Sequence, residues 1–283
     1  MLRLPRSLAT VYTRPAMTAQ RILCVLALAL LVAGCARGVI APEQVAVKFP
    51  RPATLAGDLY RPAGEGPFPA LVLLHGCSGI QPNTLTWAHW LRSEGYVALV
   101  LDSFSGRGLK RLCSDSSPLT GQARATDVWA AAQHLTRLPF VDGARIGAIG
   151  WSHGGWTVLH APRFDYLYPD VALKALVAFY PFCGDQAVYR GAIPLLILAG
   201  ADDNWTPARP CELLAESARR DGKDVTIVVY PGAHHGFDSA HVARPIVIAD
   251  ARRGAGATVA YDPAAHEDAR KRLHRFLEAK LKH

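Results

Sequence analysis

The chain has 283 residues, of which 50% are hydrophobic and 19% are charged, and its formal net charge is +8. This composition excludes a disordered chain, a collagen and a coiled coil. Four arginines before Cys35 supply half of the net charge, and no block of five or six bases follows, so no nucleic-acid partner is expected.

Residues 1–34 are predicted to be a secretory signal peptide. Arg21 precedes an apolar run from Ile22 to Gly34. This run is shorter than the ~20 residues that a transmembrane helix needs. Met17 fits the start of such a signal better than Met1, because MTAQR leads directly into the apolar run.

The segment Val32-Ala33-Gly34-Cys35 resembles the lipobox of bacterial lipoproteins. In those proteins the chain is cut before the cysteine, which then carries lipid. The resemblance implies a lipidated Cys35, a linker over residues 35–44 and a periplasmic domain held at the membrane by its acyl chains. Ala36, where an Asp is often linked with inner-membrane retention, favours the outer membrane. A soluble periplasmic protein cut nearby is the alternative.

Residues 45–283 are predicted to form a single α/β domain. Extended segments at 45–49 and 54–60 come first, and segment 238–260 is expected to be a loop. Short apolar runs bounded by Gly and Pro predict buried strands at 70–75, 96–101, 145–150, 173–180, 194–200 and 225–230. Helices are predicted at 84–94, 120–138, 153–161, 207–220 and 264–282. This alternation predicts a mostly parallel sheet with helices on both faces.

The most informative motif is Gly150-Trp151-Ser152-His153-Gly154, which fits the pattern G-x-S-x-G. A predicted strand ends at Gly150 and a predicted helix begins at His153. This is the setting of a nucleophile elbow, in which a strained turn exposes the serine hydroxyl. The alternative is a serine in an ordinary glycine-rich turn.

A serine nucleophile needs a base, and the base needs an acid that orients it. Asp202 and Asp203 follow the strand at 194–200, and His234 and His235 follow the strand at 225–230. Sites of open α/β sheets lie at the carboxyl ends of strands, and the chain order Ser, Asp, His is that of α/β hydrolases. A solvated turn acid and a loop histidine are the alternatives.

These motifs resemble the dienelactone hydrolase family of the α/β-hydrolase superfamily over residues 45–282. The resemblance includes H-G-C-x-G, the elbow, G-x-x-D-x-x-x-P, H-G-F and Y-D-P-A-A. It implies the α/β-hydrolase fold and a triad of Ser152, Asp203 and His235. Asp203 has the family spacing, three residues after Gly200, and His235 directly precedes G-F.

The resemblance also implies an oxyanion hole made by the backbone N–H groups of Cys77 and His153. Arg107 is a candidate for holding a substrate carboxylate. The alternative is that it ties down its own loop through Asp102. Trp151 and Trp205 flank site positions and are candidates for substrate contacts. Trp156 and Phe182 flank site positions as well, and the alternative is that most of these four aromatic residues are core residues.

Four cysteines remain after the predicted export and lipidation: Cys77, Cys113, Cys183 and Cys211. An even number in an oxidising compartment predicts two disulfides, although four cysteines allow three pairings. The pairs Cys77 with Cys113 and Cys183 with Cys211 are favoured, because each member follows a predicted strand at one end of the sheet. Four free thiols are the alternative. The sequence contains no C-x-x-C, which disfavours a zinc site.

The sequence thus predicts a serine hydrolase that cleaves a small-molecule ester or lactone through an acyl-enzyme intermediate, with no metal or organic cofactor. Dienelactone hydrolase proper has a cysteine nucleophile, whereas this chain has Ser152. A peptide or amide hydrolase with the same triad is one alternative. A noncatalytic envelope lipoprotein that uses the fold as a binding module is another. The sequence does not specify the substrate or the oligomeric state.

Overall fold

The computed structural model describes residues 41–48, 54–185 and 188–282. The predicted signal peptide, Cys35 and most of the predicted linker lie outside these residues. Within the described ranges, no helix combines the length and the apolar character needed to cross a membrane.

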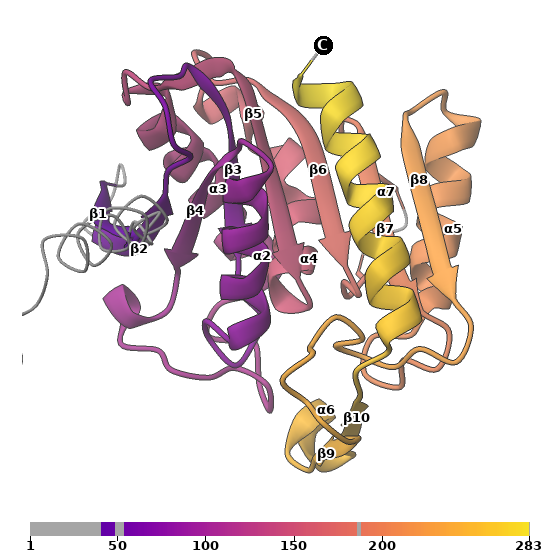
Figure 1. The fold of residues 1–283 in the computed structure, drawn as a ribbon. Helices are drawn as coiled ribbons and strands as arrows, with labels where there is room; N and C mark the ends of the chain where they lie inside the picture. The colour runs from indigo at the N-terminus through magenta and orange to yellow at the C-terminus, as the bar shows by residue number, and fades with distance from the viewer. Residues whose placement is uncertain (1–40, 49–53, 186–187, 283) are drawn as a thin grey trace, which may run out of the picture. The chain divides into compact units, whose positions relative to one another are not determined.

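Within the described residues, eight strands form one sheet in the order β1-β2-β4-β3-β5-β6-β7-β8 (Figure 1). The strands are β1 Glu43–Lys48, β2 Thr54–Tyr60, β3 Phe68–Leu74, β4 Val97–Asp102, β5 Val141–Trp151, β6 Leu173–Phe179, β7 Leu195–Gly200 and β8 Val225–Tyr230. β2 pairs antiparallel with β1 and β4, and all other neighbours are parallel. The predicted, mostly parallel sheet is confirmed.

Helices cover both faces of the sheet. They are α2 Pro82–Ser93, α3 Gly121–Thr136, α4 His153–His160, α5 Ala208–Arg220, α6 Ala251–Gly254 and α7 Pro263–Leu281, with 3₁₀ turns at Ser105–Arg107, Ala161–Arg163 and Asp165–Leu167. α2 and α7 pack on one face of the sheet, whereas α3, α4 and α5 pack on the other (Figure 1). α7 buries a stripe at four-residue spacing, from Ala265 to Leu281, as an amphipathic helix must.

The segment 238–260 differs from the predicted loop. β9 Ile246–Ile248 and β10 Ala257–Val259 form an antiparallel hairpin, and α6 lies between them. Strands of three residues are too short to show a hydrophobic period in sequence. Tertiary contacts hold them instead: the N–H of Thr258 donates to Asn204 Oδ1 at 2.9 Å. In addition, Arg111 Nη2 lies 2.6 Å from Asp250 Oδ1.

Among the described residues, two disulfides are present, and they are the pairs that the sequence favours. Cys77, after β3, is bonded to Cys113, after β4. Cys183, after β6, is bonded to Cys211, in α5. Each bond joins two segments near the carboxyl ends of parallel strands and so adds a covalent link between the loops there.

Candidate active site

Ser152 occupies a strained turn between β5 and α4. Its φ is 53° and its ψ is −112°, a left-handed conformation that few residues other than glycine adopt. The motif glycines permit this turn: a Cβ on Gly150 would lie 2.1 Å from the Gly154 carbonyl oxygen, and a Cβ on Gly154 would lie 2.0 Å from that of Leu74. The N–H of Ser152 donates to the Phe179 carbonyl at 2.9 Å, which ties the turn to the end of β6.

The structure brings Ser152, His235 and Asp203 together from the ends of β5, β8 and β7. Ser152 Oγ lies 2.9 Å from His235 Nε2, and His235 Nδ1 lies 2.8 Å from Asp203 Oδ2. Asp203 and His235 are buried, so the chain of hydrogen bonds is shielded from water. The backbone N–H groups of Trp205 and Thr206 donate to Asp203 Oδ1 at 2.8 and 2.9 Å and orient its carboxylate.

The electrostatics of Asp203 determine which nitrogen of His235 carries the proton. Burial disfavours the carboxylate, but the charge and hydrogen bond of His235 and the two backbone N–H groups outweigh it, so the pKa of Asp203 lies below its usual value. An ionised carboxylate only accepts hydrogen bonds, so His235 Nδ1 is the donor. His235 Nε2 is therefore free to accept the Ser152 proton.

The neighbouring acid and histidine do not join this arrangement. The Asp202 side chain is exposed, and its backbone carbonyl lies 3.0 Å from His234 Nδ1. The local turns explain the difference: the N–H of Asp202 donates to the Ala233 carbonyl at 3.0 Å, which joins the two loops through the backbone of the first residues after each strand. Of Asp202 and Asp203, and of His234 and His235, only the second residue joins the hydrogen-bonded chain to Ser152.

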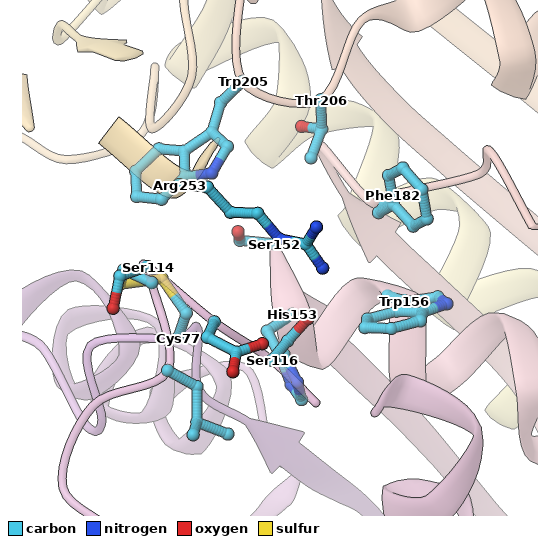
Figure 2. Close-up of a pocket in the computed structure, with 13 residues that line it drawn as sticks. Cys77, Ser114, Ser116, Ser152, His153, Trp156, Phe182, Trp205, Thr206 and Arg253 are labelled. Carbon is cyan, nitrogen blue, oxygen red and sulfur yellow. A yellow bond between two sulfur atoms is a disulfide. The ribbon is translucent and has the colours of Figure 1, made fainter. Parts of the chain in front are cut away.

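Cys77 and His153 lie with Ser152 on one cavity of about 240 Å³ (Figure 2). Among the hydrogen bonds of the described residues, neither backbone N–H donates to a protein acceptor. The carbonyl of Cys77 accepts from the N–H of Leu112 at 2.8 Å, and the disulfide to Cys113 holds the same loop. Both N–H groups therefore remain available to a ligand at Ser152.

The family model described as the dienelactone hydrolase family matches residues 55–281. The chain belongs to the dienelactone hydrolase family. A candidate carboxymethylenebutenolidase of Methylorubrum extorquens is 27% identical over 224 residues, which cover 71% of this chain and 74% of that protein. Human dipeptidyl peptidase 8 is 25% identical over 222 residues, which cover 64% of this chain and 25% of the peptidase.

The solved structures agree on the fold. A dienelactone hydrolase-like promiscuous phosphotriesterase from metagenomic libraries superposes with a TM-score of 0.65 at 24% identity, over 85% of this chain and 99% of that chain. The α/β-hydrolase fold implied by the sequence is thus confirmed, and family membership supports a hydrolase activity.

A second cavity of about 140 Å³ also borders Ser152. His235 lines it, together with four aliphatic side chains of the segment 238–260: Val242, Ile246, Ile248 and Val259. Trp205 lines both cavities, and its ring centroid lies 4.8 Å from that of His235. The predicted position of Trp205 beside the site therefore agrees with the structure.

Arg107 lies elsewhere, which corrects its assignment as a substrate contact. Its guanidinium makes a bidentate ion pair with buried Asp127, at 2.7 and 2.9 Å, and donates to the Ser103 carbonyl at 2.7 Å. It lines neither cavity. Asp102, its alternative partner, instead accepts from the N–H of Phe104 at 2.9 Å. Arg107 thus ties down its own loop through a carboxylate in α3.

Trp151, next to Ser152 in the chain, borders the smaller cavity, but its side chain is only 1% exposed. Its indole Nε1 donates to buried Asp238 at 2.9 Å. Asp238 also accepts from Trp87 Nε1 at 2.7 Å and from the Tyr180 hydroxyl at 2.7 Å. The Tyr180 ring packs against His235 with centroids 4.5 Å apart. Asp238, which follows H-G-F directly, therefore connects the elbow with the histidine loop, a role that sequence reasoning missed.

Arg253 is a second residue that sequence reasoning missed. It lies in α6, its φ is 57°, and its guanidinium points into the larger cavity beside Ser152 (Figure 2). No motif surrounds it in sequence. Only the hairpin β9–β10, held to the acid loop and to Arg111, brings α6 over the site.

Within the described part of the chain, no group of three or more His, Cys, Asp or Glu side chains is arranged to hold a metal ion.

Proposed function

We propose that the protein is a serine hydrolase that cleaves carboxylic ester or lactone bonds through an acyl-enzyme intermediate. The hydrogen-bonded chain from Ser152 through His235 to Asp203, with distances of 2.9 and 2.8 Å, carries this proposal. The names of the dienelactone hydrolase relatives, among them the candidate carboxymethylenebutenolidase, support an ester or lactone rather than an amide.

In the proposed reaction, Ser152 Oγ attacks the substrate carbonyl carbon while His235 Nε2 takes the hydroxyl proton. The N–H groups of Cys77 and His153 stabilise the oxyanion of the tetrahedral intermediate. When this intermediate collapses, His235 returns the proton to the leaving oxygen and the alcohol departs. Water then attacks the acyl-enzyme, again with His235 as the base, and releases the acid. Asp203 orients His235 and stabilises its cationic form throughout.

The two cavities support a proposal for where the two halves of the substrate bind. We assign the alcohol to the smaller cavity, because His235 must protonate the leaving oxygen and lines that cavity. The acyl group then extends into the larger cavity, which contains Trp156, Phe182 and Arg253. A lactone would occupy both cavities with one molecule.

Arg253→Gln is expected to raise KM about 10-fold for esters whose acyl chain ends in a carboxylate, because the variant loses a charge-assisted hydrogen bond. Neutral acyl esters of the same length should be unaffected. Steady-state kinetics with a matched pair, a p-nitrophenyl hemiester of a dicarboxylic acid and its neutral analogue, measures the difference. An equal change for both esters would contradict a charge-specific role, and Arg253→Lys should restore part of the selectivity.

The proposed function is tested by labelling the soluble part of the chain, residues 36–283, with a fluorophosphonate probe. The native protein should be labelled and should hydrolyse p-nitrophenyl esters of graded chain length, because both reactions need an activated serine. Ser152→Ala should do neither. Absence of labelling and of turnover in the native protein would exclude the serine mechanism and favour a noncatalytic binding role.

We further propose that the protein is exported and lipid-anchored at Cys35. The two disulfides support this, since such bonds persist in oxidising compartments and are rare in the bacterial cytosol. Expression of the full chain should place it in the membrane fraction with oxidised thiols, and Cys35→Ser should release it from that fraction. A native protein found in the cytosol with four free thiols would refute the proposal.

A further inference from the structure

Arg124, in α3, is a fully buried arginine that touches both sides of the proposed oxyanion hole. Its Nη1 donates to the His75 carbonyl at 2.8 Å and lies 3.1 Å from His153 Nδ1. His75 directly follows β3 and precedes Cys77 by two residues. Arg124 Nη1 therefore contacts the backbone two residues before Cys77, one proposed donor, and the side chain of His153, the other proposed donor.

The charge of Arg124 is not neutralised by a direct ion pair among the described residues. Asp127 is the nearest candidate in sequence, but Arg107 occupies both of its carboxylate oxygens. Arg124 Nε and Nη2 have no hydrogen-bond partner in the described part of the chain. Its guanidinium carbon lies 5.2 Å from the centre of the Phe104 ring. A buried cation with spare donors is costly, so its retention calls for a functional reason.

The protonation states around Arg124 are consistent with this arrangement. Burial lowers the pKa of Arg124 to about 10, which leaves it charged at neutral pH. Burial and the charge of Arg124 lower the pKa of His153 to about 3. His153 is therefore neutral: its Nε2–H donates to the Leu119 carbonyl at 2.8 Å, and its Nδ1 accepts from Arg124.

We propose that Arg124 is a positioning residue that fixes the spacing of the Cys77 and His153 N–H groups and whose buried charge favours the oxyanion. This inference rests on the proposed function, since an oxyanion forms only if Ser152 attacks a carbonyl. The bridge from the His75 carbonyl to the His153 imidazole joins the end of β3 to the start of α4. Asp127 and Asp102 stabilise the charge of Arg124 through space, but neither carboxylate makes an ion pair with it among the described residues. A buried positive charge of this kind stabilises negative charge that develops nearby.

The test compares Arg124→Met and Arg124→Lys with the native chain, and uses Arg107→Lys as a matched control from the same charge cluster. Arg124→Met should lower kcat about 100-fold with KM changed less than about 3-fold, because the lost interactions act on the transition state. Arg124→Lys keeps the charge but cannot hold both acceptors in the same geometry, so its kcat should be intermediate. Arg107→Lys should stay within about 2-fold of native, since the ion pair with Asp127 that it alters is not a contact with Cys77 or His153.

Binding of phenylboronic acid, which forms an anionic tetrahedral adduct with the serine, separates positioning from general stability. Its affinity should fall in parallel with kcat in the Arg124 series, in samples shown by circular dichroism to be folded. A folded Arg124→Met variant with native kcat would overturn the inference. So would a phenylboronic acid affinity that changes in parallel with KM rather than with kcat.

If neither arginine variant folds, His153→Leu decides, because it keeps the backbone N–H and removes the imidazole that Arg124 holds. It should lower kcat about 10-fold and weaken phenylboronic acid binding to the same degree. Native values of both in this variant would overturn the inference. In every case the native enzyme must first be shown to hydrolyse the ester. If it does not, the proposed hydrolase function is wrong, and the experiment does not bear on Arg124.

Discussion

Asp203→Asn is expected to lower kcat for ester hydrolysis by about 10⁴-fold while the protein remains folded. The asparagine oxygen can still accept from the N–H groups of Trp205 and Thr206, so the acid loop keeps its turn. The amide nitrogen would then face His235 Nδ1 as a donor. The imidazole would have to carry its proton on Nε2, where it can no longer accept the proton of Ser152.

The adjacent acid provides the control for this experiment. Asp202→Asn removes the same charge one residue away, but the Asp202 side chain is exposed, whereas Asp203 is buried against His235. Its kcat should stay within a factor of about 2 of native, since no transition-state contact is lost. Steady-state hydrolysis of a p-nitrophenyl ester and thermal melts of both variants measure the two effects. The role assigned to Asp203 is wrong if Asp203→Asn retains a tenth of native kcat, or if the loss appears in Asp202→Asn.

Gly154→Ala is expected to abolish activity and to reduce the free energy of unfolding by about 4 kcal/mol or more, at the upper end of single-residue effects. Its Cβ would lie 2.0 Å from the Leu74 carbonyl oxygen and 2.8 Å from that of His75. Both contacts are with backbone at the end of β3, so the clash cannot be relieved by rotating a side chain. The end of β3 must move away from α4, and the loop that contains Cys77 moves with it.

Gly143→Ala, at the start of β5 and far along the chain from the elbow, separates this effect from the general cost of replacing a glycine. The added Cβ would lie 3.4 Å from Thr136 Cγ2, an ordinary contact. Its free energy of unfolding should change by less than about 1 kcal/mol, and its activity should be native. Chemical denaturation with parallel ester assays measures both variants. A Gly154→Ala protein with native stability and activity would show that the elbow tolerates the displacement.

Much of this architecture follows from local patterns. Buried runs such as ALVLL of β3 and LLILAG of β7 are apolar at every position, which is typical of parallel strands covered on both faces, and the structure places each of them inside the sheet. The strained turn at Ser152 was also predictable, because the glycines that permit it are written into G-x-S-x-G. The disulfide pairs followed from the expectation that loops after parallel strands gather at one edge.

The sequence by itself therefore determined the sheet, the helices that cover it and the loops that carry Ser152, Asp203 and His235. Only the tertiary structure decided which charged side chains meet. Arg107 pairs with Asp127, and Arg253 reaches the cavity through a hairpin of two three-residue strands. The burial of Arg124 and Asp238 also became visible only in three dimensions. The physical reason is that strand and turn preferences are set by neighbours in the chain, whereas the partner of a charge is set by packing between elements that no local pattern records.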